Sequence, residues 1–115
     1  MVEPNEAWPL IKTAAIKAMD AKMIWHSLKQ KKQYRVHGVG NDRIVIYRIH
    51  KGTTQDLTAD KIFAAAQKLN QSGGTIRRRT LISPTVAEET AFVLFHPQLT
   101  WSEDHKYILD TNFQL

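Results

Sequence analysis

The sequence contains no cysteine, and this absence excludes disulfide-bonded scaffolds, thiolate nucleophiles and every zinc site built on cysteine. It also lacks any run of about 18 apolar residues, the length that a membrane-spanning helix requires. The first residues, from Met1 to Glu6, are acidic and polar, whereas a secretory signal begins with basic residues and continues with apolar ones. Together these absences predict a cytoplasmic protein.

Glycine and proline are scarce, because the 115 residues include only 5 glycines and 4 prolines, and no segment is repeated. Such a composition excludes collagen-like and low-complexity chains. Hydrophobic residues make up 43% of the chain and charged residues 23%, which is typical of a globular protein. A chain of this length forms one domain, so residues 1–115 are predicted to be a single domain.

Positive charge is unevenly distributed along the chain, whose formal net charge is +5. Residues 22–51 contain eight lysines and arginines against a single aspartate, and three arginines follow one another at 77–79. Residues 80–115 contain five acidic residues against one lysine. Concentrated positive charge favours a polyanionic partner. The alternative interpretation is a solvated basic face that keeps the protein soluble.

The chain begins with a predicted helix over residues 6–19, because apolar residues recur there with the helical spacing of about 3.6 residues. Pro9 fits only the first turn of a helix, which predicts a start at Asn5 or Glu6. The apolar pattern nearly continues beyond residue 19. We expect the helix to bend or break near Asp20 rather than to continue.

The segment from Tyr34 to Ile49 predicts a β-hairpin, because two runs of β-branched and aromatic residues flank the turn Gly40-Asn41-Asp42. Both faces of the second run are largely apolar, which predicts a central strand covered on both sides. Four large residues are predicted to be buried anchors of the core: Trp25, Ile46, Phe63 and Leu94.

Two further helices are predicted after the hairpin. Residues 53–57 are read as a loop, and Thr58 has the features of a helix N-cap, with Leu57 and Ile62 as a hydrophobic staple. Residues 70–74 end this helix at two glycines.

The last helix is predicted from Ser83-Pro84 to Phe95, with a buried strand over residues 91–95 as the alternative. Residues 75–82 fit either a strand or a short helix. The tail fits either a capped helix start at residues 100–103 or an edge strand at 107–109. The predicted fold is therefore a small α+β domain with an N-terminal helical segment, a central antiparallel hairpin and two later helices; a winged-helix-like arrangement is a variant of it.

The sequence offers little catalytic chemistry. The 5 histidines form no HExxH motif and no i, i+4 pair. The pairs Glu88-Glu89 and Glu103-Asp104 are adjacent, so on a helix their side chains diverge by about 100°; both pairs are expected to complement helix N-termini. We predict no metal site, no cofactor and no catalytic residue, and expect a binding protein rather than an enzyme.

Two basic clusters indicate nucleic-acid binding. In residues 73–80 a Gly-Gly turn leads into three arginines flanked by threonines, a pattern suited to gripping phosphates. The alternative is an exposed edge strand blunted by charge. In residues 29–35 basic residues follow Trp25 and His26, a combination that suits phosphate binding with stacking; a solvated helix end is the alternative.

These clusters predict a non-enzymatic protein that grips the phosphates of nucleic acid, DNA more readily than RNA, in a bacterial or phage setting. An acidic partner protein is the alternative partner, and a homodimer is compatible with either function. The candidate nucleic-acid contacts are Lys29, Lys31, Lys32, Arg35, Arg43, Arg77, Arg78 and Arg79.

The segment from Tyr34 to Ile49 also resembles the central hairpin of the RelE/ParE-like toxins, small basic proteins of which some cleave ribosome-bound messenger RNA. The resemblance covers 16 of the 115 residues. It implies a further strand with a His-Arg ending, where the sequence predicts a loop and a helix. It implies action on RNA as the alternative function, with four residues to test: Arg43, Tyr47, Arg48 and His50.

Overall fold

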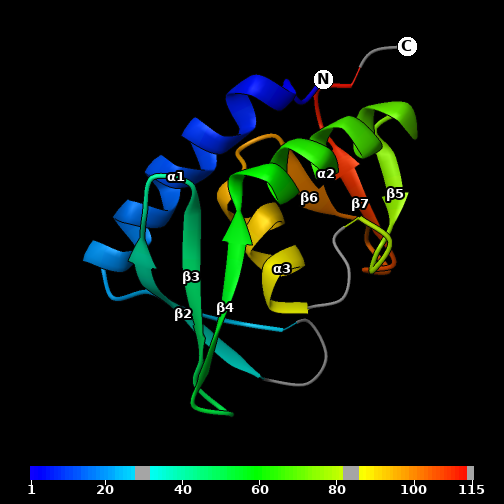
Figure 1. The fold of residues 1–115 in the computed structure, drawn as a ribbon. Coiled ribbons are helices and arrows are strands. Elements are labelled where there is room, and N and C mark those ends of the chain that lie inside the picture. The colour runs from blue at the N-terminus through cyan, green and yellow to red at the C-terminus, as the bar shows by residue number, and fades with distance from the viewer. Residues whose placement is uncertain (28–31, 82–85, 114–115) are drawn as a thin grey trace.

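The computed structural model describes residues 1–27, 32–81 and 86–113, and it confirms the predicted α+β class (Figure 1). In this part of the chain, no helix has both the length and the hydrophobicity needed to cross a membrane. In chain order the elements are α1 (Pro4–Asp20), β1 (Ile24–His26), β2 (Gln33–Val39), β3 (Arg43–Arg48), β4 (Thr53–Thr58), α2 (Ala59–Gln71), β5 (Thr75–Arg77), α3 (Val86–Phe95), β6 (Leu99–Trp101) and β7 (Tyr107–Asp110).

Helix α1 begins earlier than predicted. Pro4, rather than Pro9, occupies the first turn, and Pro9 lies inside the helix on its exposed side. The proline removes one backbone donor there, and solvent can solvate the carbonyl that loses its partner. The predicted break near Asp20 is confirmed, and the chain then enters strand β1 instead of a second helix.

Four strands form an antiparallel sheet in the order β1-β2-β3-β4. The predicted hairpin is confirmed as β2 and β3, and β3 is a central strand. The predicted loop at residues 53–57 is wrong, because these residues form β4. Strand β4 pairs with β3 along its whole length, from Arg43 opposite Thr58 to Arg48 opposite Thr53. Its polar sequence carries no hydrophobic alternation, so this pairing, rather than burial, specifies the strand.

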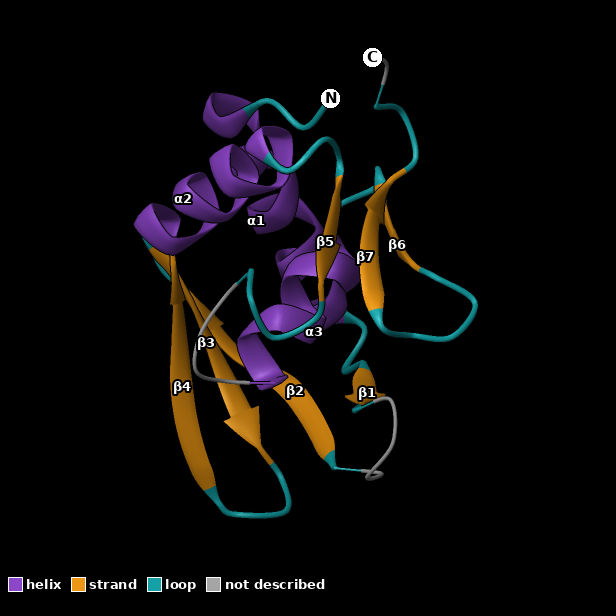
Figure 2. Cartoon of the chain, turned by 90° about the vertical axis from the view of Figure 1, so that its right-hand side faces the viewer, coloured by secondary structure: helices purple, strands orange, loops and turns teal. Residues whose placement is uncertain are grey.

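Only one face of this sheet is covered, which corrects the prediction that β3 is buried on both sides. Ile44 and Ile46 are completely buried under the helices, whereas Val45 and Tyr47, on the opposite face, are only half-buried. Figure 2 shows α3 between the two sheets of the molecule. A face with apolar β-branched residues can remain open when longer side chains such as Arg35 cover part of it.

Helix α2 follows its sequence signals closely. The Thr58 hydroxyl accepts a hydrogen bond from the Lys61 amide (3.2 Å), which confirms the N-cap. The predicted inward stripe is buried: Ile62, Ala65, Ala66 and Leu69. Phe63, predicted to be a core anchor, is instead 38% exposed, because it lies one position beyond this stripe on the outer face of the helix.

The turn after α2 contains two glycines with positive φ, Gly73 (+75°) and Gly74 (+79°). A Cβ atom added at Gly74 would lie 2.4 Å from Cγ of Phe113, whereas one at Gly73 would meet nothing within 4 Å. Gly73→Ala therefore serves as a control for Gly74→Ala, because it introduces the strain of a side chain at positive φ without a steric clash.

We expect Gly73→Ala to lower the free energy of unfolding by about 1 kcal/mol, the strain of a side chain in the left-handed region. Gly74→Ala should lower it by about 3 kcal/mol, because overpacking against Phe113 adds to the same strain. Urea denaturation of the two variants measures the difference. Equal losses would contradict the packing of Phe113 on this turn.

A second, three-stranded sheet has the order β5-β7-β6. It resolves the choice for residues 75–82 in part, because residues 75–77 form a strand and a turn follows. It also shows that residues 107–109 belong to a central strand, not an edge strand. Residues 99–101 form β6, so the helix start at residues 100–103 is wrong.

Helix α3 is confirmed, with its end at Phe95, and the alternative of a strand over residues 91–95 is wrong. The predicted cap Ser83-Pro84 lies outside the described residues. Trp25 is a core residue as predicted, at 6% exposure, with its ring edge-on to Phe95 at 5.4 Å. Leu94 is 44% exposed, so the prediction that it is a core anchor is wrong. The other side chains of α3 are buried, except that of Val86, which is half-buried.

Candidate nucleic-acid interface

The three arginines follow the short strand β5, which ends at Arg77. The chain then turns, and the Arg78 amide donates a hydrogen bond to the carbonyl of Lys106 (2.8 Å). The Thr80 hydroxyl donates to the carbonyl of Arg77 (2.5 Å) and closes the turn. This turn therefore lies directly beside the loop that joins β6 to β7.

Two helices anchor the same turn. A carboxylate oxygen of Glu89, in the first turn of α3, accepts a hydrogen bond from the Arg79 amide (2.7 Å). Glu89 is only 2% exposed. The ammonium of Lys68 on α2 donates to the carbonyl of Thr80. The β6–β7 loop, α2 and α3 therefore all hold the backbone of the turn, and the arginine side chains take no part in these bonds.

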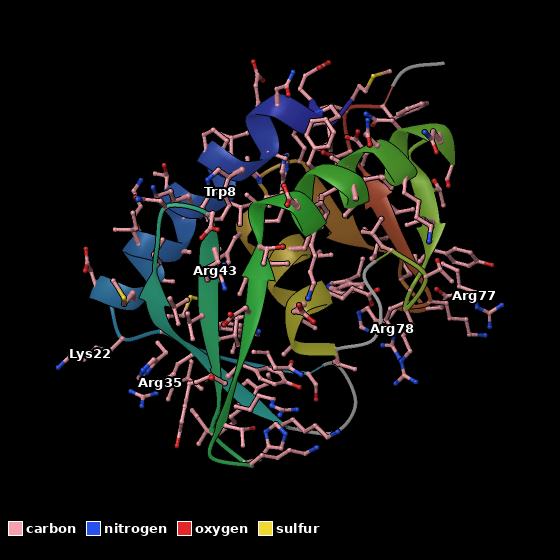
Figure 3. The ribbon with its side chains drawn as sticks, viewed as in Figure 1. Trp8, Lys22, Arg35, Arg43, Arg77 and Arg78 are labelled. Carbon is pink, nitrogen blue, oxygen red and sulfur yellow. The ribbon has the colours of Figure 1, made fainter. Side chains whose placement is uncertain are left out.

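These side chains line a depression of about 320 Å³ at the surface. Its lining, here called the arginine depression, consists of Arg77, Arg78, Arg79, His105 and Lys106. Arg77, Arg79, His105 and Lys106 are exposed, and Arg78 is half-buried. Figure 3 shows Arg77 and Arg78 extending from the right-hand side of the molecule, away from the four-stranded sheet.

Among the described residues, none that lines the arginine depression is acidic. In the part of the chain that the structure describes, none of its three arginines forms an ion pair with a carboxylate. Four positive charges thus line one depression, although Asp104 interacts electrostatically with Lys106 and the carboxylate of Glu89 lies under the backbone of Arg79. Such a site attracts anions, and guanidinium groups match phosphate oxygens in a bidentate geometry.

Backbone strain concentrates at this depression. Arg79 (φ +72°) and His105 (φ +58°) are two of the three non-glycine residues with positive φ among those described. The left-handed region costs such residues about 1–2 kcal/mol each, and strain of this kind clusters at functional sites. The strained residues here place their side chains into one basic surface.

The other predicted contacts lie elsewhere. The guanidinium of Arg35 lies over the ring of Tyr47, at 4.7 Å from its centroid, on the open face of the four-stranded sheet. In Figure 3, Arg35 is on the lower left and Arg77 on the right. Arg35 therefore does not belong to the same surface as the arginine depression.

Arg43 is engaged by carboxylates. Its guanidinium forms hydrogen-bonded ion pairs with Asp42 (3.0 Å) and Asp56 (3.0 Å). Hydrogen bonding to Asp42, and then to Asp56, raises the pKa of Arg43 further above its usual value. The same contact with Arg43 lowers the pKa of Asp42. Because both carboxylates would compete with a phosphate, we assign Arg43 no place in the interface.

Lys29 and Lys31 lie outside the described residues, but Lys32 is described. Lys32 lines a second depression, of about 180 Å³, together with Arg48 and His50.

The sequence alone did not indicate that His105 and Lys106 belong to the arginine depression. Lys106 is the one basic residue of an acidic tail, and only the pairing of β5 with β7, with Arg77 opposite Tyr107, brings it to the arginines.

The structure does not bring together the four residues that the toxin resemblance implied. Arg43 and Arg48 lie at opposite ends of β3. Tyr47 is on the open face of the sheet with Arg35, whereas Arg48 and His50 line the second depression. A strand does follow the hairpin, yet β4 ends at Thr58 without the His-Arg ending.

Among the described residues, no three histidine, aspartate or glutamate side chains are grouped so that they could hold a metal ion. Comparisons with protein-family models, with curated proteins and with solved structures find no match to this chain. Its function must therefore be inferred from its own residues.

Proposed function

We propose that this protein binds nucleic acid without cleaving it and that the arginine depression grips the backbone phosphates. We place this activity in the cytoplasm and expect duplex DNA to be preferred over RNA. The observation that carries the proposal is the convergence of Arg77, Arg78, Arg79 and Lys106 around one depression that no carboxylate of the described residues lines.

The anchoring of the turn supports the same function. A flexible basic loop would lose conformational freedom on binding, which costs about 0.5–1.5 kcal/mol for each immobilised side chain. Here the hydrogen bonds that the Arg78 and Arg79 amides donate to Lys106 and Glu89 already fix the backbone of the turn. A fixed backbone removes the cost of ordering the loop on binding. A basic face kept only for solubility has no need of this anchoring.

Salt dependence tests the proposal, because each phosphate contact releases counterions. If each of the four cationic side chains of the arginine depression contacts one phosphate, the logarithm of the binding constant should fall with the logarithm of the salt concentration with a slope of about −4. Fluorescence anisotropy with a labelled duplex measures this slope. The same titration with single-stranded DNA and with RNA ranks the three partners.

An acidic protein partner predicts a different result. Binding to duplex would then be absent at physiological salt, and capture of an acidic partner would be indifferent to added DNA. Either observation would contradict the proposal. Cleavage of RNA, free or on ribosomes, would contradict the non-enzymatic part of it and favour the toxin-like alternative.

Arg79→Gly separates binding from folding at a single residue. Glycine adopts the left-handed backbone of this position without strain. We expect the free energy of unfolding to stay the same or to rise by up to about 1 kcal/mol. The affinity for duplex should fall severalfold, equivalent to about 1 kcal/mol, because one phosphate-binding charge is lost. Thermal melting and anisotropy of the same sample measure both effects; a stable variant with unchanged affinity would exclude Arg79 from the interface.

A further inference from the structure

The second basic depression, here called the hairpin depression, has a volume of about 180 Å³. It lies where β2 begins and β3 ends, and the first turn of α3 closes one side of it. Six of its lining residues have polar side chains: Lys32, Tyr34, Arg48, His50, Lys51 and Gln55. None of the described residues that line it is acidic.

The positive charges of the hairpin depression are held by the sheet. Arg48 lies opposite Tyr34 across the β2–β3 pair, and its Nε atom donates a hydrogen bond to the Thr53 hydroxyl (3.0 Å). That bond orients the guanidinium and leaves its remaining donors without a carboxylate among the described residues. Lys32 and Lys51 add two further charges from the chain segments on either side.

Tyr34 distinguishes this depression from a solvated basic patch. The residue is only 2% exposed, and its ring packs against Trp25 (5.9 Å between centroids) and edge-on against His50 (5.6 Å). Its hydroxyl forms no hydrogen bond to any described residue, although the side chain lines the depression. Burial raises the pKa of Tyr34, partly offset by the charge of Arg48, so the phenol keeps its proton and can donate.

We propose that the hairpin depression binds a phosphate monoester, the dianionic group found at the 5′ end of a nucleic-acid strand and on a free nucleotide. Three positive charges from Lys32, Arg48 and Lys51 favour a dianion over the monoanionic phosphodiester, and the Tyr34 hydroxyl supplies a directed donor. The depression has room for a phosphate group. Recognition of a strand end rests on the nucleic-acid binding proposed above, whereas binding of free phosphate does not.

The position of α3 relates the two depressions. Val86 and Ala87 line the hairpin depression, and Glu89, less than one turn later, anchors Arg79 of the arginine depression. The two basic sites therefore lie on either side of the first turn of α3. When the internal phosphates of a nucleic-acid strand contact the arginine depression, the phosphate at the end of that strand is available to the hairpin depression.

The test compares two duplexes of one sequence, one with a 5′-phosphate and one with a 5′-hydroxyl, by fluorescence anisotropy. We expect wild type to bind the phosphorylated duplex at least threefold more tightly. Tyr34→Phe keeps the ring, and Arg48→Gln removes the best-oriented charge; both should abolish this preference. Arg77→Gln is the matched control, since it removes one charge from the arginine depression and should weaken both duplexes equally.

Inorganic phosphate and a nucleoside 5′-monophosphate separate the two proposals. In amide NMR spectra, each should shift the resonances around residues 48–51 of wild type, and Tyr34→Phe should weaken this binding severalfold. If this result is seen while no duplex binds, the phosphate site stands and nucleic-acid binding fails. If duplex binds without preference for the 5′-phosphate and neither small ligand shifts residues 48–51, the phosphate site is wrong and nucleic-acid binding stands.

The variants must remain folded in both the anisotropy and the NMR experiments. Lys51 is exposed, so Lys51→Gln replaces Arg48→Gln if the latter melts early. Shifts of equal size in wild type, Tyr34→Phe and Lys51→Gln would mean that phosphate associates with the protein non-specifically, and this would overturn the proposal.

Discussion

Replacing Ile46 by alanine is expected to lower the free energy of unfolding by about 2–5 kcal/mol, the range for removing a large aliphatic side chain from a packed core. Ile46 is completely buried and lies on β3, the strand paired on both sides, opposite Val36 and Gln55. Neighbouring strands restrain the backbone on both sides, so the cavity cannot collapse easily. Urea denaturation followed by circular dichroism measures the loss.

Val45→Ala is the matched control, because Val45 is the next residue of the same strand and lies half-buried on the open face. It should cost less than about 1 kcal/mol. A loss below 1 kcal/mol at Ile46, or equal losses at both positions, would mean that the two faces of the sheet are not distinguished as described.

Replacing the three arginines together should have the largest effect on function. Arg77→Ala, Arg78→Ala and Arg79→Ala combined are expected to reduce the affinity for duplex at least tenfold, or about 1.4 kcal/mol. Folding should change little, because exposed surface substitutions usually stay within about 0.5 kcal/mol and the anchoring bonds use backbone atoms of the turn. Anisotropy and thermal melting measure the two effects.

The control removes three charges from the other side of the molecule: Lys12→Ala, Lys17→Ala and Lys22→Asn, the last because asparagine tolerates the left-handed backbone of Lys22. These lysines lie on α1 and just after it. If both triple variants lose affinity equally, the effect is one of net charge and the arginine depression has no special role.

The sequence predicts most strongly those elements whose signals are local. The β2–β3 hairpin and helix α2 were both predicted from neighbouring residues, since the turn at 40–42, the cap at Thr58 and the stripe from Ile62 to Leu69 are short-range patterns. Strand β4 was missed because its polar sequence gains its bonds from β3. Strands within residues 75–82 and at 107–109 were among the alternatives, but the pairing of β5 with β7 could not be predicted, because these two strands lie about thirty residues apart.

Burial of charged residues was the least predictable feature. Glu88 and Glu89 lie in the first turn of α3, as expected for carboxylates that complement a helix N-terminus, yet both are only 2% exposed. Glu88 forms an ion pair with Lys61 at 2.5 Å, and Glu89 accepts from the Arg79 amide. Lys61 lies on α2 and Arg79 in the turn after β5. The sequence pattern of residues 86–95 therefore does not indicate these two contacts.

The interface was likewise predictable only in part. Three consecutive arginines after two glycines suggest a phosphate-binding turn from sequence alone. The contribution of His105 and Lys106 depends on the register of β5 with β7. The neutralisation of Arg43 depends on Asp56, which lies on β4, the strand that the sequence did not predict.

The most direct measurement is the salt dependence of duplex binding for wild type beside the triple arginine variant. Each lost phosphate contact should reduce the magnitude of the slope by about 1. The four cationic side chains of the proposed interface predict a slope of about −4 for wild type and about −1 for the variant. Equal slopes for the two proteins would show that the three arginines contact no phosphate and would contradict the proposed function.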